Sequence, residues 1–123
     1  MGQKGQSYYG QRGEFCLAKR VKVEWLFQGM LEYCVMLLLR KESCYASDII
    51  ARLKAAELIV VEGTLYPLLT RLKNDGLLSY EWRESTQGPP RKYYLLTESG
   101  AAFLEQLDSA WASLVATVNL IKS

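Results

Sequence analysis

The chain has 123 residues and a net charge of +2, and half of its residues are hydrophobic. This length and composition suit one domain with a modest core and exclude a disordered tail. Residues 1–24 carry five Lys or Arg against two Asp or Glu, whereas residues 97–123 carry one against three. Neither block is a polybasic tract, so any binding of nucleic acid depends on a few placed cations.

The cysteines are Cys16, Cys34 and Cys44, and the chain has no histidine. This odd number argues against a disulfide framework, and no spacing fits a metal site. The longest strongly apolar run, residues 35–39, is too short to span a bilayer, and no apolar segment follows the basic N-terminus as a signal peptide requires. We therefore expect a reduced, cytoplasmic protein without a metal or cofactor. Because no catalytic motif is present, we do not expect an enzyme.

Residues 1–22 are rich in Gly, Gln, Ser and Tyr, which predicts a basic, flexible N-terminal extension over residues 1–24. A basic arm that reaches DNA and a segment ordered by a dimer partner are the open alternatives. The first helix is predicted over residues 30–41, which are apolar on almost every side. Such a helix lies inside a core or between two subunits, and for so small a chain we favour the second. Its expected interface residues are Leu31, Cys34 and Leu38.

A second helix is predicted over residues 45–56, with Ser43 or Ser47 as its N-cap and Asp48 in its first turn. A short link then leads to the third helix, within residues 62–76.

The third helix has the clearest pattern in the chain. Thr64 is a candidate cap, Pro67 is compatible with a first turn, and Gly76 is a C-terminal stop. Four leucines at i, i+3, i+4 and i+7 form one apolar face, namely Leu65, Leu68, Leu69 and Leu72. The other face is polar, and by itself it fits an ordinary solvated helix.

After Gly76 the apolar period changes from helical to alternating. Residues 78–83 and 91–96 are each typical of a strand, and residues 84–90 contain the glycine and prolines of a turn. Together they predict a β-hairpin with a polar tip and a basic entrance to its second strand.

Thr97 is the candidate cap of a last, long helix. Apolar residues follow it at steps of three and four, which is the seam of helices that pair with one another. A core helix within one chain is the alternative. Because the preceding elements already form a compact unit, we favour a dimer. The seam residues are Leu104, Leu107, Trp111, Leu114, Val118 and Ile121.

Three helices, a hairpin and a further helix predict a mainly α chain with a small hairpin. We assign a winged helix-turn-helix to residues 25–96 and a dimerisation helix to residues 97–123. A DNA major groove admits one α-helix, and a basic hairpin beside it can contact phosphates. The pattern therefore selects, as DNA-binding candidates, Thr64, Tyr66, Thr70, Arg71 and Lys73 on the third helix, and Gln87, Gly88, Arg91 and Lys92 on the hairpin. Each cation is also explicable as a solvated surface charge, but their convergence on two adjacent elements favours DNA.

The segments EGTLYPLLTRLKNDGLLSYEW and STQGPPRKYYLLTESG resemble PadR-type transcriptional regulators. The resemblance is close through the third helix, the hairpin and the start of the last helix, and looser over residues 29–121. It implies a homodimeric repressor of the short-tailed subgroup. Because a dimer has two-fold symmetry, we expect its double-stranded DNA operator to be pseudo-palindromic. Residues 1–22 depart from the family pattern.

The resemblance also implies roles for individual residues. Those that would face DNA are Tyr45, Ser47, Thr64, Tyr66, Pro67 and Arg71, with Arg91 and Lys92 as wing contacts. Some short-tailed members bind flat aromatic drugs between tryptophans of the last helix, and Trp111 stands at the corresponding place. Packing in the seam explains Trp111 equally well. The alternative function for the chain is a winged helix that binds only protein.

Overall fold

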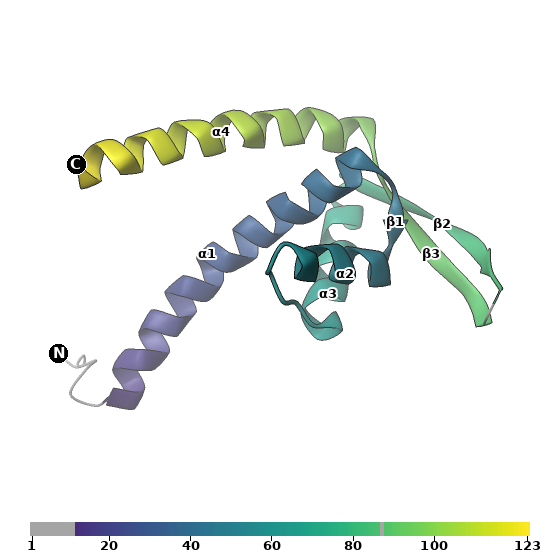
Figure 1. Ribbon diagram of the computed structural model, residues 1–123, viewed down its shortest axis with the longest axis horizontal. Helices are drawn as coiled ribbons and strands as arrows, with labels where there is room; N and C mark the ends of the chain where they lie inside the picture. Colours follow the sequence, from purple (N-terminus) through teal and green to yellow (C-terminus); the bar gives the residue numbers. More distant parts are fainter. Residues whose placement is uncertain (1–11, 87) are drawn as a thin grey trace. The chain divides into compact units, whose positions relative to one another are not determined.

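The computed structural model describes residues 12–86 and 88–123. The chain divides into two units, residues 1–32 and residues 33–123, and the candidate site lies entirely in the second. The described elements run in the order α1 (Arg12–Lys41), β1 (Cys44–Tyr45), α2 (Ala46–Ala55), α3 (Glu62–Asn74), β2 (Leu78–Ser85), β3 (Gly88–Leu96) and α4 (Glu98–Lys122) (Figure 1). The predicted winged helix-turn-helix with a C-terminal helix is confirmed, with one additional short strand.

Helix α1 begins at Arg12 rather than at residue 30, so it includes part of the segment expected to be an extension. Glu, Leu, Ala and Lys in this stretch favour a helix, and the single glycines Gly13 and Gly29 each cost only about 1 kcal/mol relative to Ala. Residues 1–11 lie outside the described residues. The division of the chain at residues 24 and 96 stays a prediction.

The start of α2 is capped differently from the prediction. Its N-cap is Tyr45, and the predicted cap role of Ser43 or Ser47 is therefore wrong. The Asp48 carboxylate accepts a hydrogen bond of 3.1 Å from the Tyr45 backbone N–H. An acidic side chain is favourable there because the helix dipole places partial positive charge at its first turn.

Helix α3 begins earlier than its predicted cap. Because the helix starts at Glu62, Thr64 lies within it and Pro67 lies beyond its first turn, contrary to both predictions. The predicted stop is confirmed. Gly76 has a φ of +82°, and the Leu77 N–H donates to the Leu72 carbonyl at 3.0 Å, which closes the helix end.

The core of the described chain consists almost wholly of aliphatic side chains. The predicted leucine face of α3 is buried throughout. The buried residues are Leu31, Val35, Met36, Leu39, Cys44, Ala46, Ile49, Leu53, Val60, Leu65, Leu68, Leu69, Leu72, Leu78, Tyr94 and Leu104. Burial raises the pKa of the Cys44 thiol to about 11, so this thiol stays protonated and takes part in packing.

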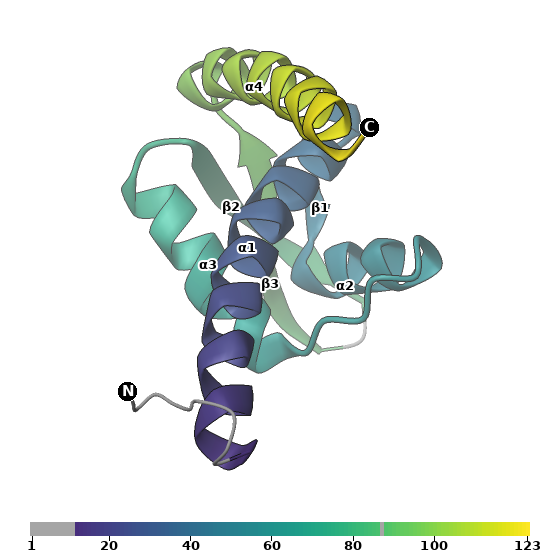
Figure 2. The same ribbon diagram turned by 90° about the vertical axis from the view of Figure 1, so that its left-hand side faces the viewer.

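The sheet has the strand order β1-β3-β2, and both pairings are antiparallel. Helix α3 packs against β2, while α2 packs against α3 and β3 (Figure 2). The hairpin turn is shorter than predicted, since β3 already begins at Gly88 and includes Pro89 and Pro90. Prolines are tolerated there because β1 pairs with β3 only at Tyr93 and Tyr94, so the outer edge beside the prolines needs no N–H donors.

A junction built on Thr97 fastens the end of α3 to the start of α4. The Thr97 hydroxyl accepts a hydrogen bond of 2.9 Å from the Gly100 N–H, which confirms its predicted role as a cap. The same hydroxyl donates to the Gly76 carbonyl at 2.7 Å. The Thr97 N–H donates to the Leu77 carbonyl at 3.1 Å. The stop turn of α3 and the first turn of α4 therefore share one hydrogen-bonded unit.

A second contact holds α4 against the last turns of α1. The Asp108 carboxylate accepts hydrogen bonds from the Tyr33 hydroxyl at 2.5 Å and from the Arg40 guanidinium at 2.7 Å. Arg40, and then Tyr33, hold the pKa of Asp108 below its usual range. The Trp111 ring lies 6.2 Å from that of Tyr33, one turn further along α4.

Replacing Gly100 by Ala should destabilise the fold. A Cβ at this position would collide with the Leu77 carbonyl oxygen and stand 2.9 Å from Cδ1 of Leu96. We expect a loss of about 1–3 kcal/mol in the free energy of unfolding, measured by thermal unfolding at fixed protein concentration. Gly63→Ala is the matched control, because a Cβ there meets nothing within 4 Å and should be neutral or stabilising. Equal effects of the two substitutions would contradict the tight junction.

Replacing Asp108 by Asn should lower the melting temperature near neutral pH. Because the folded pKa of Asp108 is depressed, its stabilising effect is present above the unfolded value of about 3.9 and is lost as the pH falls through the folded value. The difference in melting temperature between wild type and Asp108→Asn should therefore shrink below about pH 4. A difference that is unchanged from pH 7 to pH 2 would contradict the assignment.

Candidate nucleic-acid interface

The exposed part of α3 presents two polar sides. Glu62, Tyr66, Thr70 and Lys73 follow one another at helical spacing and line hollows that α3 forms with the start of α2 and with the hairpin. The second side carries Thr64, Pro67 and Arg71, of which the first two are exposed and Arg71 is half-buried. The hairpin therefore adds to only one of the two polar sides.

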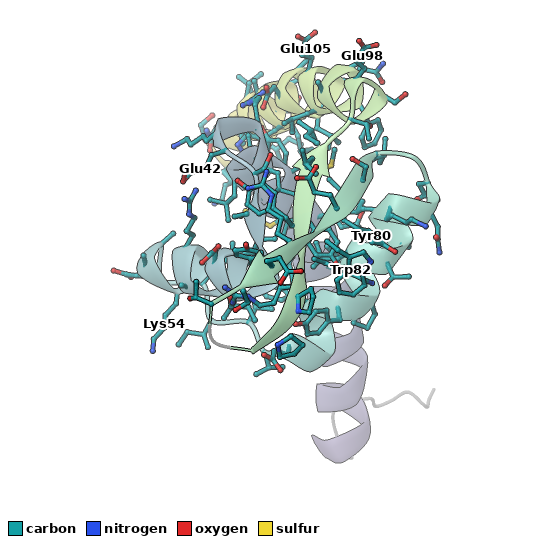
Figure 3. The ribbon with its side chains drawn as sticks, turned by 90° about the vertical axis from the view of Figure 1, so that its right-hand side faces the viewer. Glu42, Lys54, Tyr80, Trp82, Glu98 and Glu105 are labelled. Atoms are coloured by element: carbon teal, nitrogen blue, oxygen red, sulfur yellow. The ribbon has the colours of Figure 1, made fainter. Side chains whose placement is uncertain are left out.

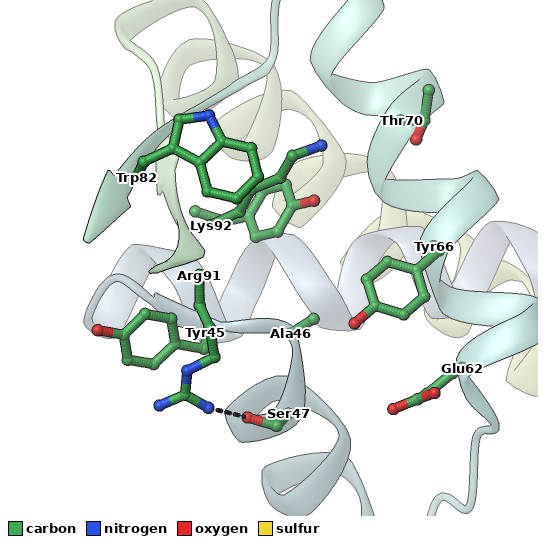
Figure 4. Close-up of a pocket in the computed structure, with 10 residues that line it drawn as sticks. Tyr45, Ala46, Ser47, Glu62, Tyr66, Thr70, Trp82, Arg91 and Lys92 are labelled. Carbon is green, nitrogen blue, oxygen red and sulfur yellow. Dashed lines mark hydrogen bonds between the residues drawn. The ribbon is translucent and has the colours of Figure 1, made fainter. Parts of the chain in front are cut away.

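A pocket of about 450 Å³ lies where the start of α2, the exposed side of α3 and the hairpin meet (Figure 4). Its walls are aromatic and hydroxyl-bearing, with two cations and one carboxylate. The lining residues are Tyr45, Ala46, Ser47, Glu62, Tyr66, Thr70, Trp82, Arg91, Lys92 and Tyr94. Six of the predicted DNA-binding residues are thus brought together, although they come from three separate parts of the chain.

Arg91 connects the hairpin to the start of α2. Its guanidinium carbon lies 4.1 Å from the centroid of the Tyr45 ring, and its Nη1 donates to Ser47 Oγ at 3.4 Å (Figure 4). The pairing of Tyr45 with Tyr93 across β1 and β3 brings Arg91 within reach. The cation is thereby held in place, while its side chain stays exposed to solvent. A guanidinium fixed in this way keeps further N–H donors for a phosphate group.

Lys92 lies over two aromatic rings of β2. Its Nζ is 4.5 Å from the centroid of Tyr80 and 5.6 Å from that of Trp82, the residue paired with Lys92 across the hairpin. Figure 3 shows both rings close to α3. Lys73 approaches Tyr80 from α3, with its Nζ 5.7 Å from the ring centroid. Aromatic faces therefore gather two lysines from different elements beside the pocket.

Arg83 is a hairpin cation with a different environment. It lies 3.6 Å above the Tyr93 ring and its Nε donates to the Glu81 carboxylate at 2.8 Å. That hydrogen bond raises the pKa of Arg83 and balances its charge. Arg83 is therefore a poorer phosphate ligand than Arg91 or Lys92.

The remaining predicted residues lie outside this pocket. Lys73 lines a smaller hollow with Thr70 and Lys92, and Gly88 lines another with Arg91 nearer the hairpin tip. Thr64, Pro67 and Arg71 line none of these three hollows. Gln87 lies outside the described residues, so its predicted role stays a prediction.

Sequence reasoning missed two exposed pocket residues, Glu62 and Trp82. Glu62 stands four residues before Tyr66, so helical spacing would have found it had the helix start been placed correctly. Trp82 is 62% exposed on the hairpin, and the alternation of β2 places it on the same face as Tyr80. A tryptophan on the exposed face of a predicted hairpin strand is a signal that could have pointed to a binding surface.

Comparison with known proteins shows the family of the chain. A family model described as the transcriptional regulator PadR-like family matches residues 35–106. The chain belongs to this family. Its match includes the whole of α2, α3 and the hairpin, and extends into α4.

Solved structures agree with this assignment. The chain is similar to a PadR-like transcription factor from Bacteroides fragilis, with 69% identity, a TM-score of 0.74, and coverage of 83% of this chain and 98% of that one. It is also similar to a PadR-like transcriptional regulator from Bacillus cereus, with 32% identity, a TM-score of 0.70, and coverage of 79% and 95%. An uncharacterised protein of Lysinibacillus sphaericus is 26% identical over 98 residues, which are 77% of this chain and 90% of that protein.

The PadR-family assignment fixes the general role. The chain is a DNA-binding transcriptional regulator and not an enzyme, as the sequence predicted. No helix in the described part of the chain is long and apolar enough to cross a membrane. Within the same residues, no group of three or more His, Cys, Asp or Glu side chains is placed to hold a metal ion.

Proposed function

We propose that this PadR-family regulator is a homodimeric repressor that acts in the cytoplasm and binds a pseudo-palindromic operator sequence-specifically. The observation that carries the proposal is the convergence of the α2 start, the polar side of α3 and the wing cations on one pocket. A helix of this kind enters the major groove, and cations beside it contact the phosphates that flank the groove.

Each element would have its own part in DNA binding. The first half of α3 would enter the major groove with Tyr66 and Thr70, while Thr64, Pro67 and Arg71 would follow the groove wall on its second side. Ser47 and Tyr45 at the start of α2, and Arg91 and Lys92 on the wing, would contact phosphates. Two-fold symmetry places the half-sites about one helical turn apart, near 10 bp.

The second half of α4 offers the surface for a second copy. Of the seam residues, Leu104 is buried within the protomer and Leu107 is half-buried, whereas the later four are exposed in the single chain. Their exposed fractions are 41% for Trp111, 53% for Leu114, 41% for Val118 and 78% for Ile121. A continuous apolar face of this length favours pairing with another helix.

Release from DNA by a small aromatic effector belongs to the same proposal. Trp111 is partly exposed on the pairing face of α4 and adjoins the Tyr33 ring. Paired indoles from two copies would present flat faces between which an aromatic ligand stacks.

The first test is a gel shift on DNA from just upstream of the gene, with unrelated competitor DNA and varied salt. We expect specific retardation at dimer stoichiometry that weakens steeply with salt, because phosphate contacts release counterions. Arg91→Ala and Lys92→Ala should each weaken binding to all sequences similarly and reduce the salt slope by about 1 for each protomer, or about 2 for the dimer.

The control for these variants is Lys54→Ala, which removes an exposed cation of α2 that does not line the pocket (Figure 3). Retardation by Lys54→Ala should match wild type. Absence of any specific shift with an intact dimer would contradict the proposed function, and an effect of Arg91→Ala at one base position alone would contradict its phosphate role.

Replacing Leu114 by Asp should separate the dimer into monomers, because the new charge would be buried between two apolar helices. Light scattering measures the change in mass. Ala116→Asp is the matched control, since residue 116 lies on the opposite side of α4 from residue 114. A dimeric mass for Leu114→Asp would rule out pairing through this seam.

A further inference from the structure

Glu62 occupies an unusual place in the candidate interface. It is the first residue of α3, and it lies on the same side of the helix as Tyr66 and Thr70 and lines the same pocket (Figure 4). Its side chain is exposed and forms no ion pair or hydrogen bond with any other described residue. The carboxylate is therefore available to a ligand.

The nearby cations do not neutralise this carboxylate. Arg91 is held over Tyr45 and against Ser47, and Lys92 lies over Tyr80 and Trp82. A free carboxylate in a surface that faces DNA is repelled by every phosphate, so it lowers affinity for all sequences alike. Such a residue is useful in the interface only where it meets a hydrogen-bond donor of the DNA.

The donors that a major groove presents are exocyclic amino groups. The first residues of a recognition helix are those that contact base edges. Adenine carries the N7 acceptor beside its N6 amino group, and this acceptor repels a carboxylate. Cytosine presents its N4 amino group without an adjacent acceptor on the same base, and Glu is its usual partner.

We propose that Glu62 is a specificity-determining residue that accepts a hydrogen bond from the N4 amino group of a cytosine in each operator half-site. The inference rests on the proposed function and names the base that this end of α3 reads. Tyr66 and Thr70 lie one and two helical turns after Glu62 and would therefore face successive positions along the same major groove.

The test compares the operator duplex defined by footprinting with a scrambled duplex of equal length and composition. Dissociation constants are measured by fluorescence anisotropy at one salt concentration for wild type, Glu62→Ala and Glu62→Gln. We expect Glu62→Ala to lower the ratio of operator to scrambled affinity about tenfold for each half-site, without weakening binding to the scrambled duplex. Glu62→Gln should shift the preference at one position from cytosine to adenine, because Gln pairs with adenine N6 and N7.

Base substitution locates the contact. Each operator C·G pair is changed in turn to T·A, symmetrically in both half-sites, which replaces the N4 donor by the O4 acceptor of thymine. At one position wild type should lose about tenfold in affinity per half-site while Glu62→Ala loses almost none. The matched control is Glu84→Ala, which removes an exposed carboxylate of the wing outside the pocket and should leave the affinity ratio unchanged.

The outcomes separate the inference from the function on which it rests. If Glu62→Ala tightens binding to both duplexes equally, Glu62 is only a surface charge and the inference is overturned. If wild type prefers no upstream sequence, the proposed function itself is overturned, and the inference with it. Far-UV circular dichroism checks that each variant is folded. If Glu62→Ala does not fold, the ratio of operator to scrambled affinity of Glu62→Gln, which keeps the side-chain size, decides whether the inference holds.

Discussion

The Thr97 hydroxyl joins the end of α3 to the start of α4. One hydrogen bond from it closes the stop turn of α3 at Gly76, and one to it from Gly100 starts α4. Gly100 is required because the Leu77 carbonyl leaves no room for a Cβ. The end of α3 and the start of α4 thus form one hydrogen-bonded unit, so in the proposed dimer the orientation of α3 would follow that of α4.

The site depends on a second constraint, the placement of cations over aromatic rings. Within the folded chain, Tyr45 holds Arg91, and Tyr80 and Trp82 hold Lys92. A long cationic side chain normally loses rotamer freedom when it binds a phosphate. Because part of this loss has already occurred in the folded chain, the proposed phosphate contacts of the wing would cost less conformational entropy. Glu62 lines the same pocket with the opposite charge, and under the proposed function this contrast would favour selective binding over binding to any duplex.

Periodicity and end signals predicted most of the fold. The leucine face of α3, the Gly76 stop, the Thr97 cap and the hairpin all follow from local patterns, which the structure confirms. Strand β1 has only two residues, too few for any period, and its pairing with β3 depends on the tertiary fold. Because no sequence pattern predicts this pairing, the sequence alone could not show that Arg91 lies over the Tyr45 ring. Thr64 is a residue type that commonly caps helices, so the sequence predicts that α3 starts after it, whereas the helix starts at Glu62. Glu62 was for this reason not among the predicted site residues.

The length of α4 makes it a lever arm. Its 25 residues span about 37 Å, with the Thr97 junction to α3 at one end and the exposed seam residues toward the other. If α4 and the junction tilt together by about 5°, the two ends of α4 are displaced relative to one another by about 3 Å, close to the rise of one base pair. In the proposed dimer, paired through α4, small changes in the packing of the seam would therefore alter the distance between the two α3 helices by about the rise of one base pair.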